Sequence, residues 1–396
     1  MTDAVAVLPE IVVSLTAIVV LMVDAGARRG RADGWLPWLT IAGLAAAGIV
    51  GLLSGATGIF FRGFVVVDAF TAFFRFVFVV LAIFAVIVAP AYLARRGVPA
   101  AEYDAIICFS TVGAMTIALS TDLITLFIGL ELMSIPVYVL AGIERRDRYS
   151  NEAALKYFLL GAFSSGILVY GFAWLYGVTG STEFTEIAAA VAREGIASPA
   201  VVVALALVTV GLGFKAAVVP FHQWTPDAYD GAPTPATAFM SVAPKAAAFA
   251  AILRVMASGL GPLSLDWALV FAILAAVTMT AGNVVALVQT NVKRMLAYSS
   301  IAHTGYILAA VAAIDAGSSA GAAVLFYVFA YGIMNLGAFA CLMYLDVEGT
   351  RGATLHELNG LWSRHAVGAV AFTVFLISLT GIPPTIGFLA KFLVIE

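Results

Sequence analysis

Hydrophobic runs of about 20 residues recur along the whole chain, separated by short polar or Gly/Pro-rich breaks. A helix of about 20 apolar residues crosses the hydrocarbon core of a bilayer, so each run predicts one membrane span. The longest loops, 181–198 and 346–365, have the length of ordinary connections. The pattern therefore predicts an all-α polytopic membrane protein with about twelve transmembrane helices. The expected spans are 5–24, 35–54, 68–94, 103–120, 122–142, 151–177, 199–219, 234–258, 267–288, 293–314, 318–345 and 366–396.

Composition agrees with a membrane protein, because 63% of the 396 residues are hydrophobic and only 11% are charged. A soluble domain carries about 45–50% apolar and about 25% charged residues. The net charge of −3 leaves no basic surplus for nucleic acid. Cys108 and Cys341 lie inside apolar runs without metal or redox spacing, which predicts two small core residues.

Positive residues gather in the loops that follow odd-numbered spans, which hold twelve of the fourteen loop lysines and arginines. The even loops hold only Arg62 and Arg193. Because positive loops stay in the cytoplasm, the odd-to-even loops are predicted to be cytoplasmic and the N-terminus to lie outside. The twelve are Arg28, Arg29, Arg31, Arg95, Arg96, Arg145, Arg146, Arg148, Lys293, Arg294, Arg351 and Arg364.

A weak internal sequence repeat predicts two related halves of the chain. Ala153-Ala-Leu-Lys-Tyr-Phe resembles Ala322-Ala-Val-Leu-Phe-Tyr, and Gly213-Phe-Lys is answered later by Gly387-Phe-Leu-Ala-Lys. Two inverted repeats of about five helices, each with a Gly-interrupted broken helix, are typical of transporters. The division expected is 1–102 for three N-terminal helices, 103–258 for the first repeat and 259–396 for a second, incomplete repeat.

Four ionisable side chains lie inside predicted spans, where a charge costs about 2.5–3.5 kcal/mol. The four are Glu131, Lys215, Lys245 and Lys391. Ion pairing between helices or snorkelling to an interface explains many such charges, and snorkelling suits Lys156 and Arg254, which lie toward the ends of their runs. It suits Glu131 poorly because a carboxylate is short. It also suits Lys391 poorly, because two consecutive prolines before it predict a helix break. Lys391 is expected to correspond to Lys215 of the first repeat.

Proton transfer is the functional interpretation of these charges. Burial lowers the pKa of a lysine from about 10.4, and an approaching carboxylate raises it again, so a lysine with a movable carboxylate partner is a proton switch. Hydroxyls of Ser164, Ser165 and Tyr306 are candidate bridges. His303 is a further candidate because an unperturbed histidine titrates near 6.5, although a helical histidine is more often a hydrogen-bonded packing residue. Lys293, at a loop edge, fits a topology anchor and a proton-entry site equally well.

A polar segment rich in proline, residues 219–235, separates the seventh and eighth spans. Its prolines interrupt helix hydrogen bonding, and Asp227, Asp230 and Thr234 are good capping residues. One histidine, His222, with two loop carboxylates is a weak signal for metal binding, so we expect no metal site here.

Five long motifs together resemble the antiporter-like membrane subunits of bacterial complex I (NADH:quinone oxidoreductase), most closely their N type. The resemblance runs from about the third span to the end. Tyr229-Asp-Gly favours the N type over the M and L types and over sodium/proton antiporter subunits, which usually have a histidine there. The motifs are Gly129-Leu-Glu-Leu-Met-Ser, Glu152-Ala-Ala-Leu-Lys-Tyr-Phe-Leu-Leu-Gly-Ala-Phe-Ser-Ser-Gly, Pro220-Phe-His-Gln-Trp-Thr-Pro-Asp-Ala-Tyr-Asp-Gly-Ala-Pro-Thr-Pro, Asn291-Val-Lys-Arg-Met-Leu-Ala-Tyr-Ser-Ser-Ile-Ala-His-Thr-Gly-Tyr and Gly381-Ile-Pro-Pro-Thr-Ile-Gly-Phe-Leu-Ala-Lys.

The resemblance implies a proton-translocating subunit in the bacterial plasma membrane that works with the other membrane-arm subunits and the lipid bilayer. It implies that Glu131 and Lys215 form the coupling pair, Lys245 the central bridge and Lys391 the terminal proton site. The sequence contains no Gly-rich nucleotide loop, flavin site or iron–sulfur ligand set, so NADH, flavin, iron–sulfur clusters and quinone are expected on partner subunits and no cofactor in this chain. Family members continue for about two more helices, which predicts that the last helices are missing here.

Two alternatives stay open on the residues. A cation/proton antiporter subunit of the same superfamily would use the same helices with an ion gradient as the driving force. A polytopic lipid-modifying enzyme would use His222, Asp227 and Asp230 as catalytic groups. Such an enzyme needs paired acids or histidines on membrane-facing loops, whereas the unusual ionisable groups of this chain lie at mid-membrane.

Overall fold

Eleven of the described helical segments are long and apolar enough to cross a membrane. The computed structural model describes residues 3–27, 34–314, 319–345 and 354–396, so Arg28, Arg29, Arg31, Asp346 and Arg351 lie outside the described residues. The segments are α2 (Leu8–Gly26), α3 (Leu36–Leu53), α4 (Ala69–Val88), α6 (Ala100–Leu119), α7 (Leu123–Ala141), α8 (Arg148–Thr179), α10 (Pro199–Ala216), α12 (Thr234–Met240) with α13 (Ala243–Leu253) and η2 (Arg254–Gly259), η3 (Gly261–Leu263) with α14 (Ser264–Ala286), α15 (Val292–Ala312) and α16 (Ala320–Leu345).

The twelfth predicted span consists of two shorter apolar helices, α18 (Ala366–Thr380) and α19 (Ile386–Ile395). All twelve predicted spans therefore have a helical counterpart, and the all-helical polytopic fold is confirmed. The remaining elements are short: α1 (Asp3–Ala6), β1 (Gly58–Phe60), η1 (Phe61–Gly63), β2 (Val65–Val67), α5 (Pro90–Arg96), α9 (Phe184–Glu194), α11 (Trp224–Gly231) and α17 (Leu361–Arg364).

Three of these short elements, β1, β2 and α9, were not expected from the sequence. β1 and β2 form an antiparallel hairpin between α3 and α4. The loop 181–198, predicted to be an ordinary connection, contains the amphipathic helix α9, which buries Phe184, Ile187 and Val191. Their spacing of three to four residues is the signal that the prediction overlooked.

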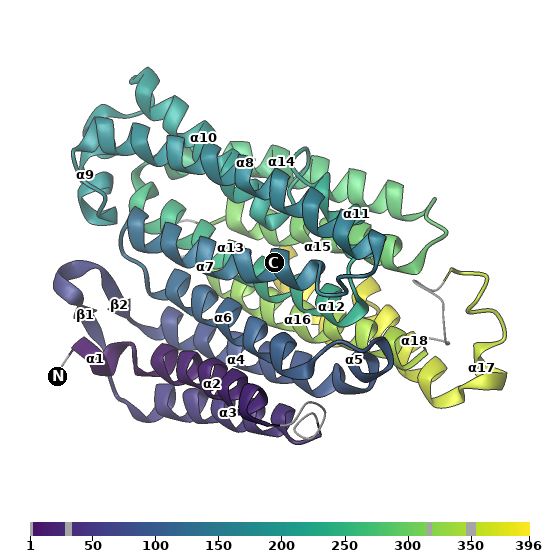
Figure 1. The fold of residues 1–396 in the computed structure, drawn as a ribbon. Coiled ribbons are helices and arrows are strands. Elements are labelled where there is room, and N and C mark those ends of the chain that lie inside the picture. Colours follow the sequence, from purple (N-terminus) through teal and green to yellow (C-terminus); the bar gives the residue numbers. More distant parts are fainter. Residues whose placement is uncertain (1–2, 28–33, 315–318, 346–353) are drawn as a thin grey trace.

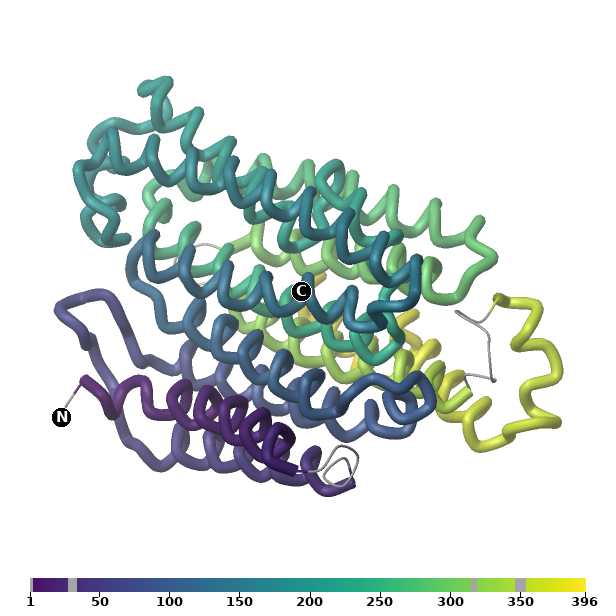
Figure 2. The backbone as a smooth tube through the Cα atoms, viewed as in Figure 1, coloured from purple at the N-terminus to yellow at the C-terminus, as the bar shows by residue number. Residues whose placement is uncertain are grey.

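Burial identifies the centre of the helix bundle. The most apolar stretch of 18 residues within Thr234–Gly259 is completely buried, whereas the corresponding stretch of Gly261–Ala286 is 22% buried and those of α2 and α3 are each 28% buried. Figures 1 and 2 show α2 and α3 at one edge and α8 and α10 at the opposite edge, with α13 between them. α13 packs against α4, α6, α7, α10 and α16. Side chains of α13 therefore face protein on all sides, and apolar side chains of the edge helices face outward.

Two interrupted helices lie where the sequence predicts breaks. α10 ends after Lys215, where Ala217 adopts a left-handed φ of 65°, and the chain resumes as α11. α18 ends at Gly381, with φ 83°, and α19 starts after Pro384. Prolines and left-handed residues cannot continue an α-helix. Such breaks at membrane depth occur only against protein or a water-filled cavity, so both are candidate ion pathways.

Candidate functional site

Glu131 and Lys215 face each other from α7 and α10, but the lysine is closer to two hydroxyls than to the carboxylate. Lys215 Nζ donates to Ser134 Oγ at 2.8 Å and to Tyr138 Oη at 3.2 Å. Its distance to Glu131 Oε1 is 3.8 Å. The same Glu131 oxygen accepts a hydrogen bond of 2.6 Å from Ser165 Oγ. The structure thus brings together three of the residues named from the sequence and adds Ser134 and Tyr138.

This geometry is a loose ion pair with alternative partners for both charges. The Lys215 side chain is 3% exposed and that of Glu131 is 26% exposed. A shift of about 1 Å would convert the 3.8 Å contact into a direct hydrogen bond. Gly161 of α8 gives the Tyr138 hydroxyl its space, since a Cβ at Gly161 would overlap that oxygen. The arrangement can therefore switch the lysine between carboxylate and hydroxyl partners.

Ser164 differs from its neighbour Ser165. Ser164 Oγ donates to the backbone oxygen of Gly211 at 3.4 Å and joins α8 to α10. The two serines are both buried, but only Ser165 contacts an ionisable group of the site. Ser164 is therefore a packing contact, and the two residues form a matched pair for mutagenesis.

Lys245 lies on the central helix α13 and is 3% exposed. Its Nζ donates to Ser300 Oγ at 2.5 Å and to the Ser300 backbone oxygen at 2.8 Å. Tyr331 Oη donates to the same Ser300 Oγ at 2.7 Å. Among the described carboxylates none lies within 4 Å of Lys245. The central lysine is therefore bound by hydroxyl and backbone oxygens, in contrast to Lys215.

His303 lies on the same face of α15, one turn beyond Ser300, and is 3% exposed. Its Nδ1 is 2.8 Å from the hydroxyl of Tyr327. The ring centroid of His303 is 5.1 Å from that of Tyr331 and 5.7 Å from that of Tyr306. A buried row of hydroxyl and imidazole groups therefore leads away from Lys245.

Lys391 lies at the far end of this row. Its Nζ is 4.8 Å from the ring centroid of Tyr306 and donates to the backbone oxygen of Thr380 at 2.9 Å. Thr380 is the last residue of α18, so the ammonium interacts with the negative end of that half-helix. The expected correspondence with Lys215 needs correction, because Lys215 precedes its helix break and Lys391 follows its own. Lys215 lies in the last turn of α10, and the ammonium of Lys391, which belongs to α19, contacts the C-terminal end of α18.

Five contributors to the site were missed at the sequence level, and helical spacing would have indicated them. Ser134 and Tyr138 follow Glu131 by three and seven residues and so share its face of α7. Ser300 precedes His303 by three residues, and Tyr327 and Tyr331 are four residues apart. The missed residues are Ser134, Tyr138, Ser300, Tyr327 and Tyr331.

The acidic residues of the break segment serve as counter-ions. Asp227 accepts hydrogen bonds of 2.9 Å from Lys156 Nζ and from Arg294 Nη1. Burial alone would raise the pKa of Asp227, but the hydrogen bonds from Lys156 and Arg294 hold it below the ordinary value. Asp230 accepts from Asn291 Nδ2 at 2.9 Å. Within the described ranges no group of three or more His, Cys, Asp or Glu side chains is arranged to hold a metal ion.

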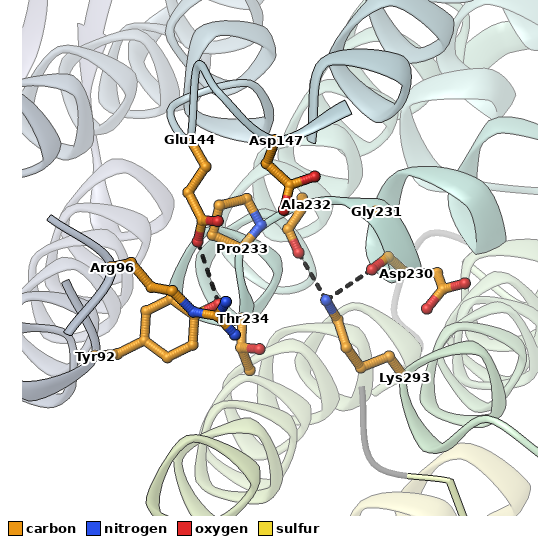
Figure 3. A pocket seen from close by; sticks show the side chains of 10 residues that line it. All are labelled: Tyr92, Arg96, Glu144, Asp147, Asp230, Gly231, Ala232, Pro233, Thr234 and Lys293. Atoms are coloured by element: carbon orange, nitrogen blue, oxygen red, sulfur yellow. Dashed lines mark hydrogen bonds between the residues drawn. The ribbon is translucent and has the colours of Figure 1, made fainter. Parts of the chain in front are cut away.

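Lys293 lies beside a small polar cavity near the ends of α5, α7 and α11 (Figure 3). Its Nζ donates to the backbone oxygens of Asp230 at 2.9 Å and Ala232 at 2.6 Å. The cavity of about 20 Å³ has room for about one water molecule. Glu144 and Asp147 line the same cavity. A protonatable cluster therefore surrounds the end of the break segment.

The snorkelling predicted for Lys156 and Arg254 is wrong for Arg254, whereas the Lys156 side chain is exposed. The Lys156 side chain is 45% exposed and forms ion pairs with Glu152 and Asp227. Arg254 is 11% exposed and hydrogen-bonds with Asp68, which is 186 residues away in the sequence. The apolar run that contains Arg254 ends there, but its side chain turns into the protein because a guanidinium can be fully hydrogen-bonded inside it.

Comparison with known proteins identifies the family of this chain. Residues 120–396 match the family described as NADH:quinone oxidoreductase/Mrp antiporter, TM. The chain is 45% identical over 388 residues to NADH-quinone oxidoreductase subunit N of Trichlorobacter lovleyi, an alignment that covers 98% of this chain and 79% of that relative. The chain belongs to the family of NADH-quinone oxidoreductase N subunits. As an N subunit it is part of the proton-translocating membrane arm of bacterial complex I.

Solved structures show the same fold in a respiratory complex I and in an Mrp complex. Respiratory complex I from Thermus thermophilus with bound Aureothin matches at a TM-score of 0.77 and 32% identity, over 98% of this chain and 81% of the matched chain. The Mrp complex from Dietzia sp. DQ12-45-1b matches at a TM-score of 0.84 and 27% identity, over 99% and 73%. The fold alone therefore does not separate the two functions, whereas sequence identity favours the N-subunit family over the antiporter alternative.

Proposed function

We propose that this N subunit moves protons through a relay in which Glu131 and Lys215 form the coupling pair, Lys245 the central bridge and Lys391 the terminal site. The observation that carries the proposal is the buried row of protonatable side chains between Lys245 and Lys391. A lysine without a carboxylate partner can release its proton more readily than one in an ion pair. The difference in partners between Lys215 and Lys245 gives the transfer a direction that depends on the position of Glu131.

Between the central and terminal lysines, the proposed carriers are Ser300, Tyr331, His303, Tyr306 and Tyr327. The Lys245 proton would pass to the Ser300 hydroxyl, and that hydroxyl would release its own proton to Tyr331 Oη once the hydrogen bond now donated by Tyr331 has reversed its direction. The ring contacts of His303 with Tyr331 and Tyr306 leave gaps that ordered water can bridge. His303 is therefore a proton carrier in this proposal as well as a packing residue.

The positive loops suggest how the relay is oriented in the membrane. We propose that the N-terminus lies outside and that the cavity beside Lys293, with Glu144 and Asp147, faces the cytoplasm. Lys293 is then the proton-entry residue, which its position at that cavity supports. Lys391 is the last protonatable group before the outer face.

We propose that energy for transport comes from partner subunits of the complex. NADH, flavin, iron–sulfur clusters and quinone would bind there, and this chain would contribute proton transfer alone in contact with other membrane-arm subunits. The division into residues 1–102, 103–258 and 259–396 is part of the proposal and is supported by a helix interrupted beside a lysine in each of the last two parts.

Two substitutions with a matched control test the relay. Lys245→Met should lower the proton-to-electron ratio of the complete complex in sealed membrane vesicles, and Tyr331→Phe should lower it partly, because it removes the hydroxyl on Ser300. Tyr344→Phe changes the same residue type on the same helix, but Tyr344 is 63% exposed and apart from the row. A normal ratio in Lys245→Met, with normal assembly, would overturn the proposed relay.

A further inference from the structure

The helix that carries Lys245 is held at its other end by a second cation, Arg254, whose side chain is largely buried and whose partner Asp68 is 38% exposed. Arg254 follows α13 and begins the π-helix η2. Its Nη1 and Nη2 each donate to one oxygen of Asp68 at 2.9 Å. Its Nε donates to the Ala118 backbone oxygen at 2.9 Å, and Nη2 also donates to Thr71 Oγ1 at 3.0 Å. These four residues, here called the Arg254 cluster, join the end of α13 to the start of α4 and the end of α6.

The Arg254 cluster is densely hydrogen-bonded, since nearly every hydrogen-bond donor and acceptor in it has a partner. Asp68 also caps α4 by accepting from the Thr71 backbone nitrogen at 2.8 Å. The guanidinium carbon of Arg254 lies 4.4 Å from the ring centroid of Phe70, within the range of cation–π attraction. Paired guanidinium–carboxylate hydrogen bonds combine strength with a fixed orientation. Arg254 therefore fixes both the height and the rotation of the end of α13.

The packing of α13 itself restrains its position along the helix axis only weakly. Six of its eleven residues are alanines, in the sequence Ala-Pro-Lys-Ala-Ala-Ala-Phe-Ala-Ala-Ile-Leu. Small side chains form shallow ridges, so they resist sliding along the helix axis less than large ones. Val242, before α13, is non-helical with φ −122° and ψ −57°, and η2 follows α13. The segment is thus bounded by irregular backbone on both sides.

Two sets of polar contacts define where this segment lies. One is the Lys245–Ser300 contact near its start, and the other is the Arg254 cluster after its end. Arg254 follows Lys245 by nine positions, which is about 13.5 Å of helix at 1.5 Å per residue. A displacement of about 1 Å at Arg254 would be transmitted along this rigid helix and would break a hydrogen bond at Ser300.

We propose that Arg254 and Asp68 are positioning residues for the Lys245 step of proton transfer. They hold α13 at the position along its axis at which Lys245 Nζ reaches Ser300. The inference rests on the proposed function of Lys245, but it concerns residues that contact neither Lys245 nor the row of carriers.

A second arginine–carboxylate pair on α4, more deeply buried than Arg254–Asp68, supplies the control. Arg75 donates from Nε and Nη2 to the two carboxylate oxygens of Glu10 at 2.8 and 2.9 Å, and Nη2 also donates to the Ala6 backbone oxygen at 2.6 Å. This pair has the same chemistry and the same helix as Asp68, but it joins α4 to α1 and α2. Loss of the Arg75–Glu10 pair should weaken folding without moving α13.

The test compares Arg254→Gln and Asp68→Asn with Arg75→Gln in the complete complex. Proton-to-electron ratios in sealed vesicles are normalised to the amount of assembled complex. Arg254→Gln and Asp68→Asn should lower the ratio by about twofold or more, the lower end of the effect of mutations between coupled sites, and Arg75→Gln should lower the yield of complex with an unchanged ratio. Arg254→Lys, which keeps the charge but not the paired hydrogen bonds, should restore the ratio partly.

Combination with Lys245→Met distinguishes positioning from general destabilisation. If Arg254 acts through Lys245, Arg254→Gln should add no further loss in the Lys245→Met background. Independent, additive losses would overturn the inference. So would normal ratios for Arg254→Gln and Asp68→Asn beside a lowered ratio for Lys245→Met, a result that leaves the proposed relay intact. If Arg254→Gln prevents assembly, the proton-to-electron ratio of Asp68→Asn decides whether the inference holds. A normal ratio in Lys245→Met alone would instead remove the proposed function.

Discussion

The pairing of Glu131 with Lys215 makes a quantitative prediction for a double-mutant cycle. Glu131→Gln and Lys215→Met each remove one charge and keep a side chain of similar size. Each single substitution should lower proton transport, because the lysine loses its switchable partner or the carboxylate loses its lysine. The double substitution should be no worse than the more severe single one, since the second change removes a contact that is already lost.

The size of the coupling follows from the geometry. At the 3.8 Å between Lys215 Nζ and Glu131 Oε1, Coulomb's law with an effective dielectric constant of about 20 gives about 4 kcal/mol. The measured coupling should be smaller, because Glu131 is partly exposed and Ser134 and Tyr138 continue to bind the ammonium after Glu131 is removed. We expect a coupling free energy of about 1–3 kcal/mol, which corresponds to about 5- to 150-fold in rate.

The assay is the initial rate of proton uptake into sealed vesicles driven by NADH oxidation, measured for both single variants and the double variant at equal amounts of assembled complex. Ser165→Ala should also lower this rate, because it removes the 2.6 Å hydrogen bond to Glu131. Ser164→Ala, one position away, should leave it unchanged. Additive losses from Glu131→Gln and Lys215→Met would show that the two groups act independently and would refute the pair.

Three further predictions concern topology, the terminal site and pH. A cysteine at Arg146 should react with an impermeant reagent only from the cytoplasmic side, because the positive loops stay there; labelling from outside would reverse the orientation. Lys391→Met in the complete subunit should leave assembly near normal and lower proton pumping together with quinone reduction, and unchanged turnover and proton-to-electron ratio would make Lys391 a helix-end anchor. Burial alone would raise the pKa of Asp68, but hydrogen bonds from Arg254 and Thr71 hold it below its ordinary value of about 4. The stabilisation from this ion pair is therefore complete above about pH 4 and is lost only as pH falls through the lower folded pKa. The difference in thermal stability between the wild type and Arg254→Gln should accordingly be equal at about pH 6 and about pH 8, and a difference that shrinks at the lower pH would contradict the assignment.

The two broken helices give the lysines a shared electrostatic setting. Lys215 lies in the last turn of α10, and Lys391 reaches back to Thr380 at the end of α18. Unpaired carbonyl groups at a helix C-terminus carry partial negative charge. Both lysines thus lie next to a helix C-terminus, but only the Lys391 ammonium binds one of its carbonyl oxygens directly, whereas the Lys215 ammonium is bound by the hydroxyls of Ser134 and Tyr138.

Local properties of the sequence determined the spans and their breaks. The predicted run 5–24 became α2 (Leu8–Gly26), and the prolines at 383 and 384 separated α18 from α19, because apolar length and a missing backbone donor act without reference to distant residues. The burial of Lys215 and Lys245 was also predictable, because a charged side chain in the middle of a membrane span faces the interior of the helix bundle and avoids lipid.

Tertiary structure alone decided which groups those charges contact. Lys215 binds Ser134 and Tyr138 more closely than Glu131, and Arg254 pairs with Asp68 across 186 residues instead of snorkelling. The physical reason is that a buried helix that is apolar on every side has no preferred face in its sequence. Its rotation and height are set by neighbouring helices, so the partners of its few polar side chains exist only after the bundle has packed.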